Sequence, residues 1–275
     1  MRSTRNGSST PSWANDVRKR PGEGDFPYWL LILGVTGAVL FCRVLSDGLY
    51  AQVLATLSKG VWITIFVTLV GFALATLLGL MVAVASLSRF IVLRQAARFY
   101  TEVIRGVPIL VLLLYVAFVL APALVAVANW ALEGLGLEAV RTRDFSLLWR
   151  AIIALTIGYS AFIAEVFRAG LLSVDEGQIE AAEALGLNGW QRFRLIQLPQ
   201  ALRTILPPLG NDFIAMIKDS SLVSVLGVMD ITQLGKLTAA GNFRYFETYN
   251  VVALLYLVMT VGLSLGLRRL EKHLR

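Results

Sequence analysis

The sequence predicts an all-α integral membrane protein, and two observations lead to that prediction. The 275 residues are 57% hydrophobic and only 16% charged, with a mean hydropathy of +0.70. An ordinary soluble domain is less apolar and carries about 25% charged residues. Several apolar stretches also reach the roughly 20 residues that a helix needs to cross a bilayer. We therefore expect about six transmembrane helices joined by polar loops.

The N-terminal segment, residues 1–25, differs in composition from the rest of the chain. It is rich in Ser, Gly, Pro and Arg and shows no apolar period, so we expect a disordered cytoplasmic tail. Its charged part is too long for a signal peptide, and the apolar segment that follows has no clear cleavage site. Residues 26–275 then form the transmembrane domain. The first span is Phe26–Leu45, with Tyr28 and Trp29 placed at one membrane interface.

The remaining spans follow in order along the chain. We expect them at about Gly60–Ser88, Thr101–Ala131, Leu147–Gly170, Ile205–Met229 and Tyr249–Leu267. The last of these is unambiguous. The fourth and fifth contain charged residues, which cost several kcal/mol in hydrocarbon unless they are paired or hydrated.

Positive charge predicts the orientation of the spans. About six spans would place both termini on the same side of the membrane as the polar segment at 173–199. That side carries fourteen Lys and Arg residues near the spans, against seven on the other side. Because Lys and Arg accumulate on the cytoplasmic side, we expect both termini and this segment in the cytoplasm.

Residues for metal, redox or nucleotide chemistry are missing. The single cysteine, Cys42, cannot form an intrachain disulfide, and the single histidine, His273, has no second metal ligand nearby. The pair Gly235-Lys236 lacks the upstream glycine of a phosphate-binding loop. The net charge of +7 is explained by membrane topology and not by a nucleic acid partner. We expect no metal, no cofactor and no enzymatic activity in this chain, so any energy must come from a partner.

The longest polar interruption between apolar runs is Ser173–Pro199, and it predicts two short helices. Ser173 and Glu176 have the spacing of a capping box, so the first helix is expected to start at Ser173. Gly186 suits the left-handed turn that ends a helix.

The second short helix is expected to follow directly. Asn188 can cap it with Gln191 at the third position, and Pro199 should prevent it from continuing. Apolar side chains cluster around the corner in excess of what a connector needs: Leu185, Leu187, Trp190 and Phe193.

In this segment the chain resembles the permease subunits of ABC importers, which share a cytoplasmic "EAA" loop. The loop pattern is matched at every fixed position: Glu180-Ala181-Ala182, Gly186, Ile196, Leu198 and Pro199. Further matches resemble the polar amino acid importers: Arg105-Gly106-Val107-Pro108, Tyr159-Ser160-Ala161-Phe162, Ala164-Glu165, Arg168-Ala169-Gly170, Gly177-Gln178, Pro207-Pro208-Leu209-Gly210-Asn211 and Lys218-Asp219-Ser220-Ser221-Leu222. Val107 and Ser220 stand where this family usually has threonine. The resemblance covers roughly Leu54 to the C-terminus.

The resemblance implies a multi-pass subunit of the bacterial cytoplasmic (inner) membrane that moves a polar amino acid by alternating access. It implies a second permease, identical or paralogous, two ATPase subunits that use the ATP, and an extracytoplasmic solute-binding protein. We expect the ATPase to dock on the helix pair, through the residues Glu180, Ala181, Ala182, Leu185, Gly186, Leu187 and Trp190.

Polar residues within the spans are candidates for the translocation pathway: Tyr159, Ser160, Glu165, Asn211, Asp212, Lys218, Asp219 and Ser220. A pathway offering both charges at similar depth could compensate a zwitterionic solute for its lost hydration. The same charges could instead form pairs between helices that hold the bundle together, and both interpretations stay open. Glu165 and Arg168, three residues apart, are expected to pair with each other.

Two other functions remain as alternatives. A self-contained secondary transporter should show an internal repeat of its spans, which we do not find. A purely structural membrane subunit gives no reason for a glycine-cornered helix pair. The sequence leaves open which amino acid is carried and whether the second permease is another copy.

Overall fold

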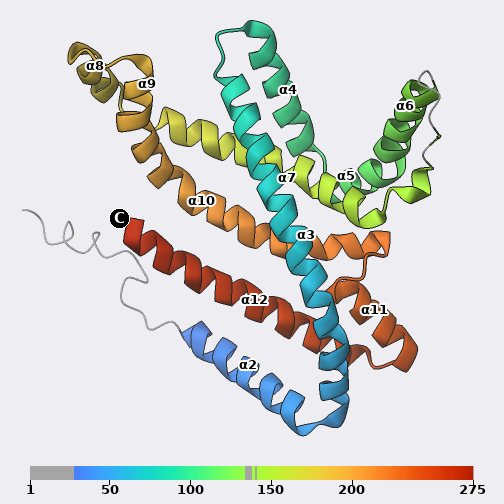
Figure 1. Ribbon diagram of the computed structural model, residues 1–275. Coiled ribbons are helices and arrows are strands. Elements are labelled where there is room, and N and C mark those ends of the chain that lie inside the picture. Colours follow the sequence, from blue (N-terminus) through green and yellow to red (C-terminus); the bar gives the residue numbers. More distant parts are fainter. Residues whose placement is uncertain (1–27, 134–137, 140, 275) are drawn as a thin grey trace, which may run out of the picture. The chain divides into compact units, whose positions relative to one another are not determined.

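The computed structural model describes residues 28–133, 138–139 and 141–274, and every regular element in these ranges is a helix (Figure 1). The expected all-α fold is thereby confirmed. The predicted tail, residues 1–25, lies outside the described residues. Helix α2, Tyr28–Ser46, belongs mainly to a unit that ends at Arg43, and the other helices belong to a second unit that starts at Val44.

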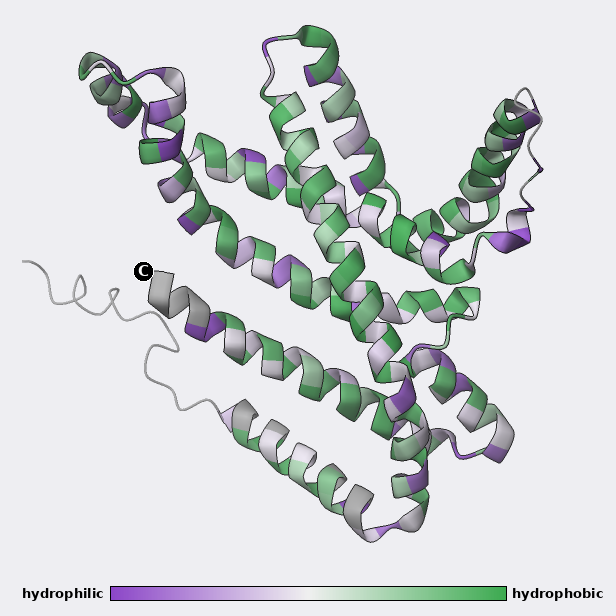
Figure 2. Cartoon of the chain, in the orientation of Figure 1, coloured by the Kyte–Doolittle hydropathy of each residue, from purple (hydrophilic) through white to green (hydrophobic). Residues whose placement is uncertain are grey.

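Helix α3, Gly48–Ser86, is the longest element, with 39 residues. It begins twelve residues before the predicted start at Gly60, because Asp47 caps it: the Asp47 Oδ1 accepts a hydrogen bond of 2.9 Å from the Leu49 amide. Lys59, which we expected to precede the span, lies inside the helix. Hydrophobic residues dominate α3 beyond this point (Figure 2).

The predicted third span, starting at Thr101, is wrong in its first part. The chain there forms four helical pieces: α4 (Ile91–Gly106), α5 (Ile109–Tyr115), the π-helical turn η1 (Val116–Leu120) and α6 (Ala121–Glu133). Val107 is extended, with ψ of 131°, because the residue before a proline is driven out of the α region. The apolar stretch long enough to cross a membrane is therefore Ile109–Glu133.

The side chain of Arg150 holds the loop after α6 against the helices. The loop contains the 3-10 turn η2, Thr142–Asp144. The Arg150 guanidinium is 6% exposed and donates hydrogen bonds of 2.9 Å to the carbonyls of Phe145 and Ala117 and a third to that of Thr142. These acceptors make the burial of a charge tolerable.

The centre of the second unit is the pair of helices α3 and α7, Leu147–Leu172. The predicted fourth span, Leu147–Gly170, is confirmed with two more residues at its end. Small residues on the buried face of α3 let the two backbones approach closely. A Cβ placed on Gly79 would lie 2.9 Å from the Ser160 carbonyl oxygen of α7.

The segment after α7 begins with two short helices and continues into a longer one: α8 (Glu176–Ala184), α9 (Gly189–Arg192), the π-helical turn η3 (Phe193–Gln197), α10 (Leu198–Asp219) and the 3-10 turn η4 (Ser220–Leu226). The predicted fifth span, Ile205–Met229, is thus displaced toward the N-terminus. Pro207 and Pro208 lie inside α10 and not at its start, although each removes one hydrogen bond of the helix.

Two helices complete the unit: α11 (Ile231–Asn242) and α12 (Tyr245–Leu274). Helix α11 packs against α3 and α12, and α10 packs against α7 and α12. The predicted sixth span, Tyr249–Leu267, lies within α12. Within the described residues, four helical stretches could cross a membrane by length and composition: Gly48–Ser86, Ile109–Glu133, Leu147–Leu172 and Tyr245–Arg269.

Candidate functional site

The predicted helix pair is present, but it begins later than expected. Helix α7 continues to Leu172, and the Ser173 hydroxyl donates a hydrogen bond of 2.8 Å back to the Gly170 carbonyl. Asp175 is the residue that precedes the first short helix, which starts at Glu176. The capping box predicted at Ser173 is therefore wrong, because Ser173 is used to end the preceding span.

The corner and the second cap agree with the prediction. Gly186 has a φ of +80°, a conformation that costs other residues roughly 1–2 kcal/mol. The Asn188 side chain accepts from the Gln191 amide, and the Gln191 side chain accepts from the Asn188 amide, both at 2.9 Å. Reciprocal capping of this kind fixes the direction in which the second helix leaves the corner.

The corner displays apolar side chains outside any core of this chain. Leu185 is 82% exposed and Trp190 is 67% exposed. The Trp190 ring lies 5.8 Å from that of Phe193, centroid to centroid. Leu187 is half-buried, and of the Glu180-Ala181-Ala182 motif only Ala182 is buried. Exposed apolar patches of this kind mark interaction sites.

An ion pair ties the two short helices to each other. The Arg192 guanidinium lies 2.6 Å from the Glu183 carboxylate, and the Gln200 amide of α10 donates to the Gln178 side chain of α8. In Figure 1 the pair projects from the end of α7. The helix pair is thus connected to α10 through its own backbone and through these side chains.

Pro199 does not end the second short helix, contrary to the prediction. The π-helical turn η3 leads from α9 into α10 without a break, and Pro199 occupies the second position of α10. Pro199 lies in the first turn of α10, where the loss of a backbone amide donor costs least. A displacement of the corner would therefore be transmitted directly into α10.

The polar residues predicted in the spans form two separate groups. In the first group, the Tyr159 hydroxyl of α7 donates a hydrogen bond of 2.8 Å to the Asp219 Oδ2 at the end of α10. Asp212 lies two turns earlier on the same face of α10. Its Oδ2 is buried and has no hydrogen-bond partner within the described residues.

Still within the first group, Asn211 and Lys218 lie on another face of α10. They are seven residues apart, and both are exposed. Lys218 forms no ion pair within the part of the chain that the structure describes. Ser220 is buried and donates to the Ile217 carbonyl. Inter-helix pairing in this chain therefore accounts for Asp219, and not for Lys218.

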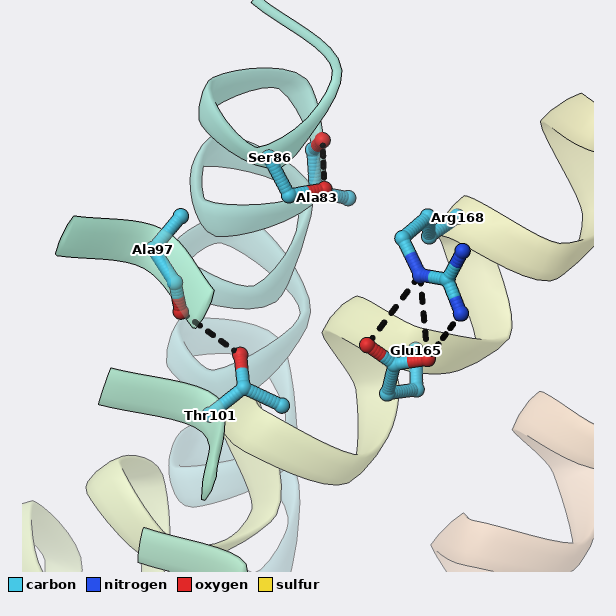
Figure 3. A network of polar contacts seen from close by, with 6 residues as sticks. All are labelled: Ala83, Ser86, Ala97, Thr101, Glu165 and Arg168. Atoms are coloured by element: carbon cyan, nitrogen blue, oxygen red, sulfur yellow. Dashed lines mark hydrogen bonds and ion pairs between the residues drawn. The ribbon is translucent and has the colours of Figure 1, made fainter. Parts of the chain in front are cut away.

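The second group surrounds Glu165 at the C-terminal end of α7. The predicted pair is present: the Arg168 guanidinium lies 2.7 Å from the Glu165 carboxylate. Figure 3 shows these two side chains facing each other, with Thr101 of α4 and Ser86 of α3 nearby. Ser160 joins the same region to α4, because its hydroxyl lies 2.6 Å from that of Tyr100.

Three charged residues of α4 near this group were not predicted as site residues. Arg98, Glu102 and Arg105 line a cavity of about 520 Å³ together with Glu165 and Arg168. Their spacing of four and three residues places them on one side of a helix. This spacing was the available signal, but the predicted third span begins at Thr101 and therefore separates Arg98 from Glu102 and Arg105.

Comparison with known proteins agrees with the resemblance. Residues 75–275, nearly three quarters of the chain, match the family described as "Binding-protein-dependent transport system inner membrane component". The glutamine transport system permease protein GlnP of Escherichia coli (strain K12) is 36% identical over 219 residues, covering 80% of this chain and 93% of that protein. The probable amino-acid permease protein YxeN of Bacillus subtilis (strain 168) is 37% identical over 210 residues, covering 76% and 87%.

Solved structures have the same fold. A subunit of a crystal structure of an amino acid ABC transporter with histidines superposes with a TM-score of 0.68 at 34% identity, covering 81% of this chain and 96% of that one. The MetNI methionine ABC transporter in an inward-facing conformation gives a TM-score of 0.61 at 23% identity, which supports the fold alone. With its helical spans and its glycine-cornered loop, the chain belongs to the binding-protein-dependent inner membrane components, the permease subunits of ABC importers.

Proposed function

We propose that this permease subunit translocates a polar amino acid across the cytoplasmic membrane. The solute class is supported by relatives named as glutamine and amino-acid permeases, each at least 36% identical. A secondary transporter and a structural subunit of another complex are not supported, because the family is defined by transport that depends on a binding protein. The partners are a second permease, two ATPase subunits and an extracytoplasmic solute-binding protein.

The observation that carries the coupling role is the exposed apolar corner on a rigid support. Leu185 and Trp190 offer apolar surface for a groove on an ATPase. The reciprocal cap at Asn188 and the Glu183–Arg192 pair hold the corner in one shape. The ATPase is a separate subunit in this proposal, and its movement reaches the spans through η3 and α10.

The pathway in this proposal runs along α10. Asn211 and Lys218 are exposed on one face of this helix, and the half-buried Asp212 adds a carboxylate whose Oδ2 is buried without a hydrogen-bond partner within the described residues. A zwitterionic solute requires groups of both signs. Tyr159 and Asp219 hold α7 and α10 together beside this face. Glu165 belongs to the other polar group and is not part of the pathway.

Reconstitution tests the proposed function. The permease is coexpressed with its genetic neighbours, the complex is purified intact, and its subunits are identified by mass. Proteoliposomes with the binding protein outside and ATP inside are then assayed for uptake of radiolabelled glutamine, histidine and leucine. We expect ATP-dependent uptake of a polar amino acid over leucine. A complex without an ATPase, or uptake that is independent of ATP, would contradict the proposal.

A further inference from the structure

The cavity between α3, α4 and α7 has the size and the charges of a ligand site. Its volume of about 520 Å³ falls within the roughly 300–1,000 Å³ of ordinary small-molecule pockets. Five ionisable side chains line it: Arg98, Glu102 and Arg105 from α4, and Glu165 and Arg168 from α7.

Among these five residues, one pair is satisfied within the part of the chain that the structure describes. Glu165 and Arg168 bind each other through hydrogen bonds from both Nε and a terminal nitrogen of the guanidinium. Arg98, Glu102 and Arg105 make no ion pair within the described residues, and Arg105 lies over the Phe162 ring, 5.6 Å from its centroid. Two guanidinium groups and one carboxylate therefore remain available to a ligand.

The cavity borders a strongly apolar, exposed face of the same helix. At 3.6 residues per turn, Val92, Phe99 and Val103 share one face of α4, and the exposed fractions of Val92 and Phe99 are 75% and 72%. Glu102 lies between this face and Arg98. In a membrane subunit, lipid acyl chains can cover such an exposed apolar face.

One end of the cavity lies near the depth of lipid headgroups. Helix α7 has 26 residues and is about 39 Å long at 1.5 Å per residue, which exceeds the roughly 30 Å of bilayer hydrocarbon. Arg168 is four residues from the end of this helix, or about 6 Å. Arg168 is therefore near the level where phosphates and amines of phospholipids reside, and Arg105, which lies over Phe162, is deeper by about two turns of α7.

We propose that this cavity binds the headgroup of a membrane phospholipid whose acyl chains lie along the apolar face of α4. Arg98 and Arg105 bind the phosphodiester by charge-assisted hydrogen bonds. Glu102 accepts from the ammonium group, which makes an aminophospholipid such as phosphatidylethanolamine the preferred ligand. Basic pockets between transmembrane helices bind phospholipid headgroups on the same principle. A free amino acid offers both charges but no chain for the exposed face of α4.

Quantification of retained lipid tests this site. The intact complex is purified in mild detergent from membranes containing phosphatidylethanolamine and phosphatidylglycerol, and bound lipid is measured by native mass spectrometry. We expect retained phosphatidylethanolamine in the wild type and loss of at least about tenfold in the double variant Arg98→Gln/Arg105→Gln, because both charged hydrogen-bond donors to the phosphodiester are removed. The matched control is Arg89→Gln, an exposed arginine at the same end of α3 that does not line the cavity.

Two further arms separate lipid from other sources of the same charges. Glycerophosphoethanolamine and glutamine are each added to the wild-type complex, and neither should release the bound lipid, because neither carries acyl chains. Release by glutamine, or equal retention by the double variant and the wild type, overturns the proposal. If the double variant is not recovered, Glu102→Gln decides: we expect its preference to shift from phosphatidylethanolamine to phosphatidylglycerol, and an unchanged preference overturns the proposal.

Discussion

At the scale of single residues, the charged groups of α10 lie in different environments. Asp219 receives a hydrogen bond from Tyr159 of α7, while Lys218, its neighbour in sequence, is exposed. Adjacent residues of a helix point about 100° apart, so they need not share a partner. The structure therefore separates a residue that joins two spans from one that is free to meet a solute.

Replacing Lys218 by methionine tests whether this face of α10 belongs to the pathway. The Lys218→Met variant keeps the length of the side chain and removes its charge, so we expect normal assembly and ATP hydrolysis. The apparent affinity for the amino acid should fall by about tenfold, since a hydrogen bond to a charged group contributes roughly 1.5–3 kcal/mol. Uptake in proteoliposomes at varied solute concentration measures this change.

Lys59→Met serves as the control for Lys218→Met, because Lys59 is an exposed lysine on α3 and should leave the affinity unchanged. Unchanged solute affinity in Lys218→Met would remove this residue from the pathway. Loss of the subunit from the membrane would show that Lys218 pairs with a group in the assembled complex instead.

At the scale of elements, the close contact of α3 with α7 depends on where α3 has no side chain. A Cβ on Gly79 would meet the Ser160 carbonyl and Ile163 at 2.9 Å, whereas a Cβ on Gly71 would find its nearest neighbour, the Met216 sulfur, at 3.7 Å. Both glycines are buried in the same helix. They differ only in the space opposite them, so they form a matched pair.

The variants Gly79→Ala and Gly71→Ala should have opposite effects on stability. Alanine favours a helix over glycine by about 1 kcal/mol, so Gly71→Ala should be neutral or stabilising. Gly79→Ala should destabilise by about 1–3 kcal/mol, because a backbone carbonyl cannot move aside. Thermal unfolding of the purified complex compares the two, and equal midpoints would contradict the packing described here.

Gly186, at the corner between α8 and α9, allows a test of the proposed coupling role that leaves side-chain packing unchanged. Nothing lies within 4 Å of a Cβ on Gly186, so Gly186→Ala changes only the backbone, at a cost of about 1–2 kcal/mol. We expect insertion into the membrane to persist and solute-stimulated ATP hydrolysis to fall. Gly189→Ala, at a glycine without positive φ, is the control and should retain stimulation. Full stimulation in Gly186→Ala would argue against a rigid coupling corner.

At the scale of the whole molecule, α7 separates two exposed sites. The loop containing Arg143 precedes the start of α7, and the corner containing Asn188 follows its end. A helix of this length spans the bilayer, so the two sites must face opposite sides of the membrane. The distribution of positive charge predicts that the corner faces the cytoplasm.

Cysteine labelling checks this orientation. In a Cys42→Ser background, a reagent that cannot cross membranes should label Arg143→Cys in intact cells. It should label Asn188→Cys only after the membrane is opened, because both positions are exposed and differ only in side. The reverse pattern would contradict both the orientation and the docking of a cytoplasmic ATPase on α8 and α9.

Local signals in the sequence were sufficient for much of the fold and for the coupling loop. Apolar length predicted the span at α12, Gly186 predicted the left-handed corner, and Asn188 with Gln191 predicted the second cap. These features depend on residues close together in the chain. The family pattern between Glu180 and Pro199 is equally local, and the match of residues 75–275 to the family confirms it.

Other features depended on tertiary contacts and could not be read from local patterns. Pro199 indicated the end of one helix, and Pro207 and Pro208 indicated the start of the next. Helix α10 nevertheless runs through all three prolines, because packing against α7 and α12 outweighs the lost hydrogen bonds. Likewise, only the positions of α3, α4 and α7 bring Arg98, Glu102 and Arg105 to the cavity beside Glu165. The sequence determined the class of membrane protein and its coupling loop. The tertiary structure decided which charges meet, because those partners lie on different helices.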